Sequence, residues 1–170
     1  EGIRIERERL AALRQNATLV IDTSEFNVHQ LKEQVIRAIK GEQGSSNFTV
    51  EVVSFGFRYG VPLDANLVMD VRFLPNPHFV PELRSHSGLE PLVRDFVLEQ
   101  QETKAFLDQF LSLLQFLIPA YRREGKSYLT IAIGCTGGRH RSVAITQAAA
   151  ARFETLGLKV RISHRDIEKG

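Results

Sequence analysis

One stretch of this sequence combines residue types that bind or attack anions: Cys135-Thr136-Gly137-Gly138-Arg139-His140-Arg141-Ser142. It lies between a predicted strand at 127–134 and a predicted helix at 142–157. A tight glycine turn before a helix directs unpaired backbone N–H groups to one place, where the helix dipole also favours negative charge. Gly137 and Gly138 allow close backbone approach, and Arg141 offers charged donors that match phosphate oxygens. The stretch therefore predicts a site for an anion the size of phosphate or a phosphosugar.

The same stretch has the C-x-x-G-x-x-R-S spacing of cysteine-dependent phosphatases, in which a thiolate attacks phosphorus. A cysteine that faces a helix N-terminus and two arginines is expected to be nucleophilic. However, Gly134 precedes it where those enzymes typically have histidine, and a general acid would have to come from elsewhere, with Asp70 as a candidate. A cysteine buried at a strand end is the purely structural interpretation. Binding, catalysis and an oligomerisation domain with an idle loop all remain open.

A second polar group of residues follows a predicted strand at 67–73, in the segment DVRFLPNPH: Asp70, Arg72, Asn76 and His78. Ligands of open α/β sheets bind at the carboxyl ends of the strands, so the two groups would share a pocket if their strands run parallel. Turn capping and solvent exposure are the alternative explanations for these side chains. Arg58 and Tyr59, in the preceding loop, are weaker candidates.

The hydrophobic pattern around these motifs alternates between strands and helices. Strands are predicted at 18–23, 48–55, 67–73, 127–134 and 158–163, and helices at 3–14, 24–40, 91–100 and 142–157. A further helix has an apolar stripe of Phe106, Phe110, Leu113, Leu114 and Leu117, and four prolines make 75–91 a long irregular segment. The pattern predicts an α/β fold, a layered sandwich with a mixed, partly parallel sheet flanked by helices.

Composition places the chain among ordinary globular proteins. It has 170 residues, of which 43% are hydrophobic and 25% charged, which argues against disordered, collagen-like and disulfide-rich classes. One cysteine and the lack of an apolar run of about 20 residues make a reducing, cytoplasmic setting the default. The start at Glu1 without a leader indicates a trimmed fragment. Zinc is disfavoured because the histidines have no paired ligand spacing: His29, His78, His86, His140 and His164.

Positive charge is concentrated near the C-terminus. Residues 135–170 have a net charge of +4, whereas residues 1–134 have a net charge of −2. Such a patch is compatible with phosphates or nucleic acid, and equally with a solvated last strand. The candidate contacts to a polyanion are Lys159, Arg161, His164, Arg165 and Lys169.

Several stretches spread over nearly the whole chain are similar to one known family: LVIDTSEFNVHQL, SFGFRYGVPLDANLVMDVRFLPNPH, SYLTIAIGCTGGRHRS and SHRDIEK. In them the chain resembles the family of the bacterial RNase adapter protein RapZ and its YvcJ-type relatives, which are P-loop-containing nucleotide-binding proteins. In that family an N-terminal domain has a Walker A loop for ATP or GTP. A C-terminal domain binds small regulatory RNA, senses amino-sugar metabolites such as glucosamine-6-phosphate, and forms oligomers.

The resemblance implies that residues 1–40 are the end of a truncated nucleotide-binding domain, that 41–47 form a linker, and that 48–170 form the RNA- and metabolite-binding domain. No G-x-x-x-x-G-K-[ST] occurs in the chain, so ATP or GTP is expected only in the missing N-terminal part and no cofactor is expected here. The implied function is regulatory rather than enzymatic: an RNase adapter that controls amino-sugar and cell-envelope precursor metabolism.

The implied partners are a phosphosugar or similar anionic metabolite, small regulatory RNA, and a ribonuclease or regulatory protein. A homo-oligomer without membrane association is also implied. Carried over by motif, the ligand-binding residues are Asp70, Arg72, Asn76, His78, Cys135, Thr136, Gly137, Gly138, His140, Arg141 and Ser142. The RNA-binding candidates are Lys159, Arg161, Arg165 and Lys169.

Overall fold

The computed structural model describes residues 2–17 and 48–169, with single positions between them at 21, 23, 26, 28, 31, 32, 35 and 38. The chain divides into two compact units, Glu1–Ser45 and Ser46–Gly170. In the first unit, α1 (Gly2–Asn16) confirms the helix that the residues at 3–14 predict. The predicted strand at 18–23, the predicted helix at 24–40 and the predicted linker at 41–47 lie wholly or mostly outside the described residues.

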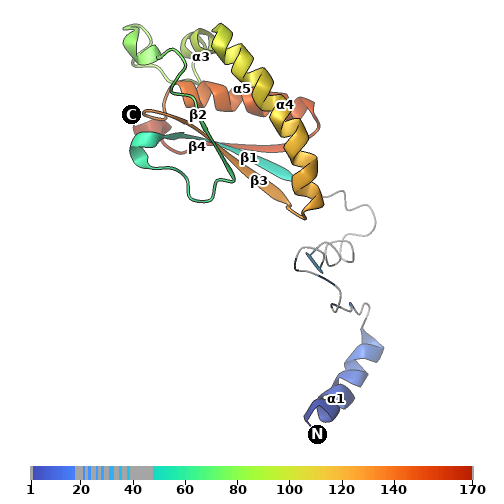
Figure 1. Ribbon diagram of the computed structural model, residues 1–170. Helices are drawn as coiled ribbons and strands as arrows, with labels where there is room; N and C mark the ends of the chain where they lie inside the picture. The colour runs from blue at the N-terminus through green and yellow to red at the C-terminus, as the bar shows by residue number, and fades with distance from the viewer. Residues whose placement is uncertain are drawn as a thin grey trace. The chain divides into compact units, whose positions relative to one another are not determined.

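Within residues 48–169 the second unit contains a parallel sheet (Figure 1). Its strands lie in the order β2-β3-β1-β4, and their bounds are β1 (Thr49–Gly56), β2 (Leu67–Asp70), β3 (Tyr128–Cys135) and β4 (Lys159–His164). All neighbouring strands are parallel, so the α/β class is confirmed and the expected mixed sheet is wrong in that detail. The short β1–β2 connection would suit an antiparallel pair, but β2 pairs with β3, so this loop returns along the sheet to begin a parallel strand.

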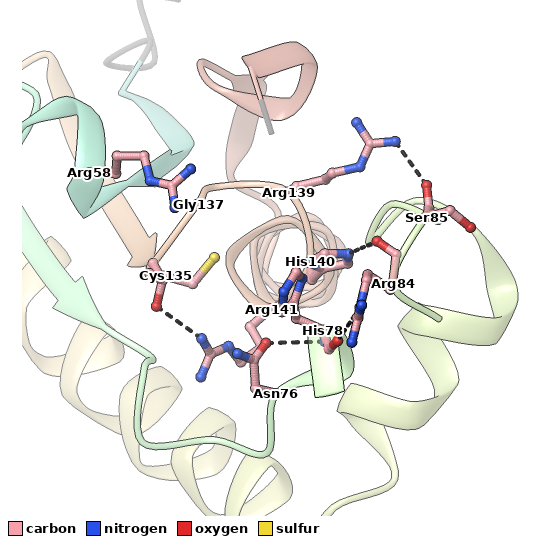
Figure 2. Close-up of a pocket in the computed structure, with 11 residues that line it drawn as sticks. Arg58, Asn76, His78, Arg84, Ser85, Cys135, Gly137, Arg139, His140 and Arg141 are labelled. Carbon is pink, nitrogen blue, oxygen red and sulfur yellow. Dashed lines mark hydrogen bonds between the residues drawn. The ribbon is translucent and has the colours of Figure 1, made fainter. Parts of the chain in front are cut away.

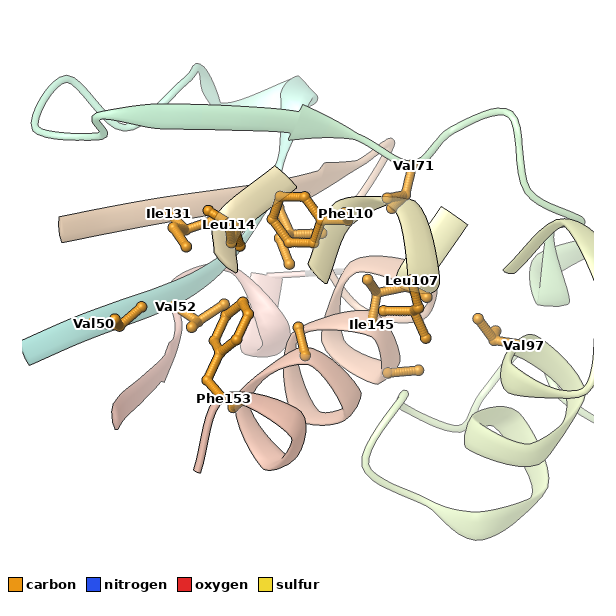
Figure 3. Packing of buried hydrophobic residues seen from close by; sticks show 14 of the residues in the cluster. Val50, Val52, Val71, Val97, Leu107, Phe110, Leu114, Ile131, Ile145 and Phe153 are labelled. Atoms are coloured by element: carbon orange, nitrogen blue, oxygen red, sulfur yellow. The ribbon is translucent and has the colours of Figure 1, made fainter. Parts of the chain in front are cut away.

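Three helices pack with the sheet around one hydrophobic core: α3 (Pro91–Leu98), α4 (Gln101–Arg123) and α5 (Arg141–Thr155). Val50 and Val52 of β1 and Ile131 of β3 contribute to the core from the sheet. Figure 3 shows these side chains together with Leu114 of α4 and Phe153 of α5. The core fixes α5 against the strands, and thereby fixes the loop that leads into it.

The buried face of α4 differs slightly from the predicted stripe. The residues of α4 in the core cluster repeat at helical spacing: Leu107, Phe110, Leu114 and Ile118. Phe110 and Leu114 confirm part of the prediction, and Phe106 and Leu117 pack at its margin. Leu113 is exposed, because the helix is rotated toward Leu107 and Ile118.

The carboxyl ends of three strands bring the polar motifs to one edge of the sheet. β1 ends at Gly56 in register with Cys135 of β3, and β2 ends at Asp70 in register with Gly134. The irregular segment between β2 and α3, which the prolines predict, contacts the same edge. There the Gly88 amide donates to the Arg139 carbonyl at 2.9 Å. The expectation that the two motifs meet at one edge is therefore confirmed.

Candidate anion-binding site

The loop between β3 and α5 folds back over the Cys135 thiol. The Gly138 amide donates to Cys135 Sγ at 3.3 Å, and Ser142 Oγ lies 3.1 Å from the same sulfur. Cys135 is 3% exposed and is a free thiol. Gly138 has φ +79°, and a Cβ on it would lie 2.7 Å from the Gly56 amide nitrogen. Only glycine fits this turn without strain, which explains one glycine of the motif.

A pocket of about 380 Å³ opens in front of this loop and beside the N-terminus of α5 (Figure 2). The first amides of α5 have no acceptor within the helix, and the helix dipole makes this end positive. The volume lies in the range of small-molecule sites. The lining residues are Arg58, Asn76, His78, Arg84, Ser85, Cys135, Thr136, Gly137, Arg139, His140 and Arg141.

Arg141 lies largely inside the protein, where it joins the pocket loop to the segment after β2. Its Nη1 donates to the carbonyls of Arg72 at 2.7 Å and Leu74 at 2.9 Å, and its Nη2 donates to Thr136 Oγ1 at 3.3 Å. The side chain is only 4% exposed, and its Nε is buried without a hydrogen-bond partner in the structure. Burial lowers the pKa of Arg141, although nearby Cys135 and Asp70 act in the opposite direction. Most of the donors expected to face a phosphate therefore bind the protein itself.

Asp70 and Arg72 pair with each other and do not line the pocket. Arg72 Nη2 lies 2.7 Å from Asp70 Oδ2, and its guanidinium lies 4.1 Å from the centre of the Phe57 ring. Hydrogen bonds from Arg72 hold the pKa of Asp70 below its usual value. Asp70 is therefore ionised at neutral pH, and its carboxylate is engaged by Arg72 outside the pocket lining, which makes it a poor general acid.

Asn76, His78 and His140 do line the pocket, as predicted residues of the site. Asn76 Oδ1 accepts a hydrogen bond from the His78 amide at 3.3 Å, and the rings of His78 and His140 lie 6.3 Å apart. His140 Nε2 donates to the Arg84 carbonyl at 3.1 Å. Burial, together with the charges of Arg139 and His78, lowers the pKa of His140.

The predicted residues divide into lining and supporting groups. Asn76, His78, Cys135, Thr136, Gly137, His140 and Arg141 line the cavity. Gly138 and Ser142 support it through their contacts with the thiol. Asp70 and Arg72 lie at the same sheet edge but outside the lining. The pocket therefore includes residues of both sequence motifs, whereas the Asp70–Arg72 pair after β2 does not line it.

Sequence reasoning gave little weight to four lining residues: Arg58, Arg84, Ser85 and Arg139. The Arg58 amide donates to the Thr136 carbonyl at 3.2 Å, and its guanidinium has no hydrogen bond or ion pair with another described residue. Arg84 Nε donates to the His78 carbonyl at 3.0 Å, and Arg139 Nη2 donates to the Ser85 carbonyl at 3.0 Å. The length of the proline-rich segment was the available signal for Arg84 and Ser85.

The basic residues near the C-terminus also divide into two groups. Lys159 and Arg161 are exposed on the edge strand β4. Arg165 and Lys169 instead pair with Asp166, at 2.7 Å and 3.0 Å. His164 bonds Ser54 Oγ at 2.8 Å and Gln147 Nε2 at 3.0 Å, and burial lowers its pKa. Only the first pair is available to a polyanion without breaking internal contacts.

The part of the chain that the structure describes offers neither a cluster of metal-binding side chains nor a membrane-spanning helix. Among these residues, no group of three or more His, Cys, Asp or Glu side chains is arranged to hold a metal ion. None of the described helices has the length and apolar character needed to cross a membrane.

The parallel sheet, the glycine turn and the cationic pocket together define an α/β domain with a basic site at the carboxyl edge of its sheet. Residues 48–168 match the RapZ C-terminal domain, and residues 1–43 match the RapZ-like N-terminal domain. The chain therefore belongs to the RapZ family.

Relatives in other bacteria cover the whole chain. A nucleotide-binding protein of Trichlorobacter lovleyi is 89% identical over 170 residues, which are 100% of this chain and 60% of that protein. Nucleotide-binding proteins of Geobacter metallireducens and Geotalea uraniireducens are 64% and 61% identical over the whole chain, which covers 60% and 59% of their lengths. The chain thus spans about three fifths of the length of the curated relatives it matches.

Proposed function

We propose that the 48–170 domain is a regulatory binding domain whose pocket holds a phosphorylated amino sugar, such as glucosamine-6-phosphate, or a related anion. One observation carries this proposal: the pocket lining includes four arginines and two histidines, and no carboxylate. A concentration of positive charge beside a helix N-terminus attracts phosphate oxygens. No acidic side chain in the lining opposes a negatively charged ligand.

Arg58 is the principal direct anion contact in this proposal. Arg84, Arg139 and Arg141 each donate hydrogen bonds to protein carbonyls, so part of their donor capacity is in use. The guanidinium of Arg58 has no such partner among the described residues and faces the cavity across from His140 (Figure 2). The planar guanidinium of arginine can also donate to two phosphate oxygens at once, whereas the ammonium of lysine acts as a point charge.

Neutral polar groups in the same lining suit the rest of a sugar phosphate. Asn76, Ser85 and Thr136 can exchange hydrogen bonds with hydroxyl or amino groups of a ring. Small-molecule sites use a few such groups to fix orientation and specificity. A hexose phosphate is therefore a better match for this lining than inorganic phosphate alone.

At the level of the whole protein, we propose that ligand occupancy regulates partners. The relatives' names support nucleotide binding, which we assign to ATP or GTP in the part of the family's N-terminal domain outside this chain. We further propose an RNase adapter role, in which a homo-oligomer in the cytoplasm binds small regulatory RNA and a ribonuclease or regulatory protein. Lys159 and Arg161 are the exposed residues on β4 that support RNA contact.

Thermal unfolding with candidate ligands tests the binding proposal. A ligand at 100 times its Kd adds about 2.7 kcal/mol to the free energy of unfolding of a one-site protein. Glucosamine-6-phosphate should stabilise the chain more than glucose-6-phosphate, a nucleotide or inorganic phosphate does. Arg58→Gln should abolish most of the shift, whereas Arg123→Gln, at the exposed end of α4, should leave it intact. Equal shifts in both variants would contradict the proposal.

A cysteine-dependent phosphatase is the alternative function, favoured by one observation. Cys135 lines the pocket, and its Sγ lies within hydrogen-bond distance of the Gly138 amide nitrogen and of Ser142 Oγ. The lining holds no carboxylic acid that could protonate a leaving group, which favours binding over this reaction. Release of phosphate from an aryl phosphate that disappears in Cys135→Ser would support the phosphatase and displace the binding proposal.

A further inference from the structure

Asp166 is a fully buried carboxylate that neither the sequence motifs nor the pocket lining singles out. It lies in the turn after β4, residues 165–169, which we call the C-terminal turn. Its Oδ2 accepts hydrogen bonds from the Gly56 amide at 2.8 Å and from Arg165 Nη2 at 2.7 Å, and its Oδ1 accepts one from Lys169 Nζ at 3.0 Å. A buried charge persists only where such partners compensate for its lost hydration.

The C-terminal turn contacts both walls of the anion site. On one side, Arg165 Nη2 donates to the Gly60 carbonyl at 2.6 Å, and Asp166 accepts a hydrogen bond from the Gly56 amide. In the chain, these contacts lie on either side of Arg58, whose guanidinium has no hydrogen-bond or ion-pair partner among the described residues. On the other side, Arg139 Nη1 donates to the Ile167 carbonyl at 3.2 Å. A segment that lies about 110 residues from Arg58 in sequence therefore fixes Arg58 relative to the loop after β3.

The two walls also touch each other directly at glycines. A Cβ on Gly56 would lie 2.6 Å from the Gly137 carbonyl carbon, and one on Gly138 would lie 2.9 Å from Asp166 Cβ. The backbones therefore pack closely at these glycines, with no room for a side chain between them. Because Asp166 holds Gly56, it also sets where Gly138 can donate to Cys135 Sγ.

We propose that Asp166 is a positioning residue for the anion site. It holds the segment with Arg58 against the loop that covers Cys135, so that cation and loop amides face one ligand position. The functional purpose of this positioning role rests on the anion binding proposed above. Closure of the loop over the thiol, however, is a consequence that requires no ligand.

Reactivity of the thiol tests the positioning role without a ligand. Cys135 is the one cysteine in the sequence, so an aromatic disulfide reagent such as dithionitrobenzoate reports on this loop alone. In the full chain, Asp166→Ala should raise the labelling rate by at least about tenfold, equivalent to about 1.4 kcal/mol in the free energy of loop opening. Asp166→Asn should have a smaller effect, because its amide oxygen can still accept from Gly56.

Two further variants keep the result interpretable. Lys169→Ala removes one hydrogen bond to Asp166 and the contact of the ammonium group with the Tyr59 ring, and it leaves Asp166 in place. It should fold, and its thiol should be labelled slightly faster than that of the wild type. Asp108→Asn removes an exposed carboxylate that pairs with Arg152 on another part of the surface, and it should label at the wild-type rate. Wild-type labelling in Asp166→Asn and Lys169→Ala, with native circular dichroism, would overturn the positioning role, whatever becomes of Asp166→Ala.

Inorganic phosphate separates this inference from the proposed function. In the wild type, phosphate should protect the thiol, and Asp166→Asn should weaken its affinity several-fold. Arg58→Gln should weaken phosphate binding, so that phosphate protects its thiol less than it protects the wild-type thiol. Faster labelling in the Asp166 variants without any phosphate protection of the wild type would contradict anion binding and leave the positioning of the loop intact. Phosphate protection of the wild-type thiol, together with a wild-type labelling rate in Asp166→Asn, would support anion binding and contradict the positioning role of Asp166.

Discussion

Two adjacent glycines of the loop after β3, Gly137 and Gly138, should respond to the same substitution with very different losses of stability. Gly138 has φ +79°, where alanine costs about 1–2 kcal/mol, and its Cβ would lie 2.7 Å from the Gly56 nitrogen. Relief of that overlap adds about 1–3 kcal/mol, so Gly138→Ala should lower the free energy of unfolding by about 2–5 kcal/mol. A Cβ on Gly137 meets no atom within 4 Å, and Gly137→Ala should change it by less than about 1 kcal/mol.

Urea denaturation followed by tyrosine fluorescence measures this difference. The sequence has no tryptophan, and Tyr59, Tyr121 and Tyr128 all lie in the Ser46–Gly170 unit, so the signal reports on that unit alone. The midpoint should fall for Gly138→Ala at an unchanged m-value. Similar midpoints for the two variants would refute the argument from backbone conformation and close approach.

Three more predictions concern titration and packing. Burial by itself raises the pKa of Asp166, but hydrogen bonds from Arg165, Gly56 and Lys169 outweigh it and hold the pKa below 3.8. This carboxylate therefore stabilises the folded protein at pH values above the pKa that Asp166 has in the unfolded chain. The stabilisation is lost as the pH falls through the lower pKa of the folded state. In urea titrations the advantage of wild type over Asp166→Asn should therefore be constant near neutrality and shrink below about pH 4. Burial lowers the pKa of His164, so its stabilising contribution is present above about pH 6.5 and is lost on acidification. His164→Gln should therefore make the free energy of unfolding depend less on pH between about pH 7 and pH 5. An unchanged dependence on pH would count against the burial of His164 as a neutral ring. Leu114 is 0% exposed, so Leu114→Ala should lower the free energy of unfolding by about 2–5 kcal/mol. Leu113 is 46% exposed, so Leu113→Ala should lower it by less than about 1 kcal/mol. Equal losses of stability in thermal unfolding would contradict the observed rotation of α4.

The strands, the helices and the anion loop of the second unit were predictable because their signals are local. Runs such as the one that forms β3 are apolar along their whole length, as buried parallel strands are, and the glycines at 137 and 138 mark the turn before α5. The irregular segment before α3 follows from its prolines. The direction of β2 and its pairing with β3 were not predictable from such signals, because the short connection after β1 is compatible with either direction for β2.

The site was predictable as a place and only partly as a set of side chains. The motif identified Cys135 and the loop around it, since close backbone approach and a helix start are encoded by neighbouring residues. It did not indicate that Arg141 Nη1 would donate its hydrogen bonds to the carbonyls of Arg72 and Leu74. Which donors of an arginine remain available depends on the chain segments that pack around it.

The amino-acid order alone therefore determined that a glycine loop forms between a buried strand and a helix, because backbone conformation and hydrophobic periodicity act over a few residues. Only the tertiary structure decided that Arg58 faces that loop and that Asp166 holds the two together. The hydrogen bond between the Gly56 amide and Asp166 exists because β4 pairs with β1, which places the turn after β4 beside the end of β1. Pairing over such a separation is chosen by the packing of the whole sheet, not by any local pattern.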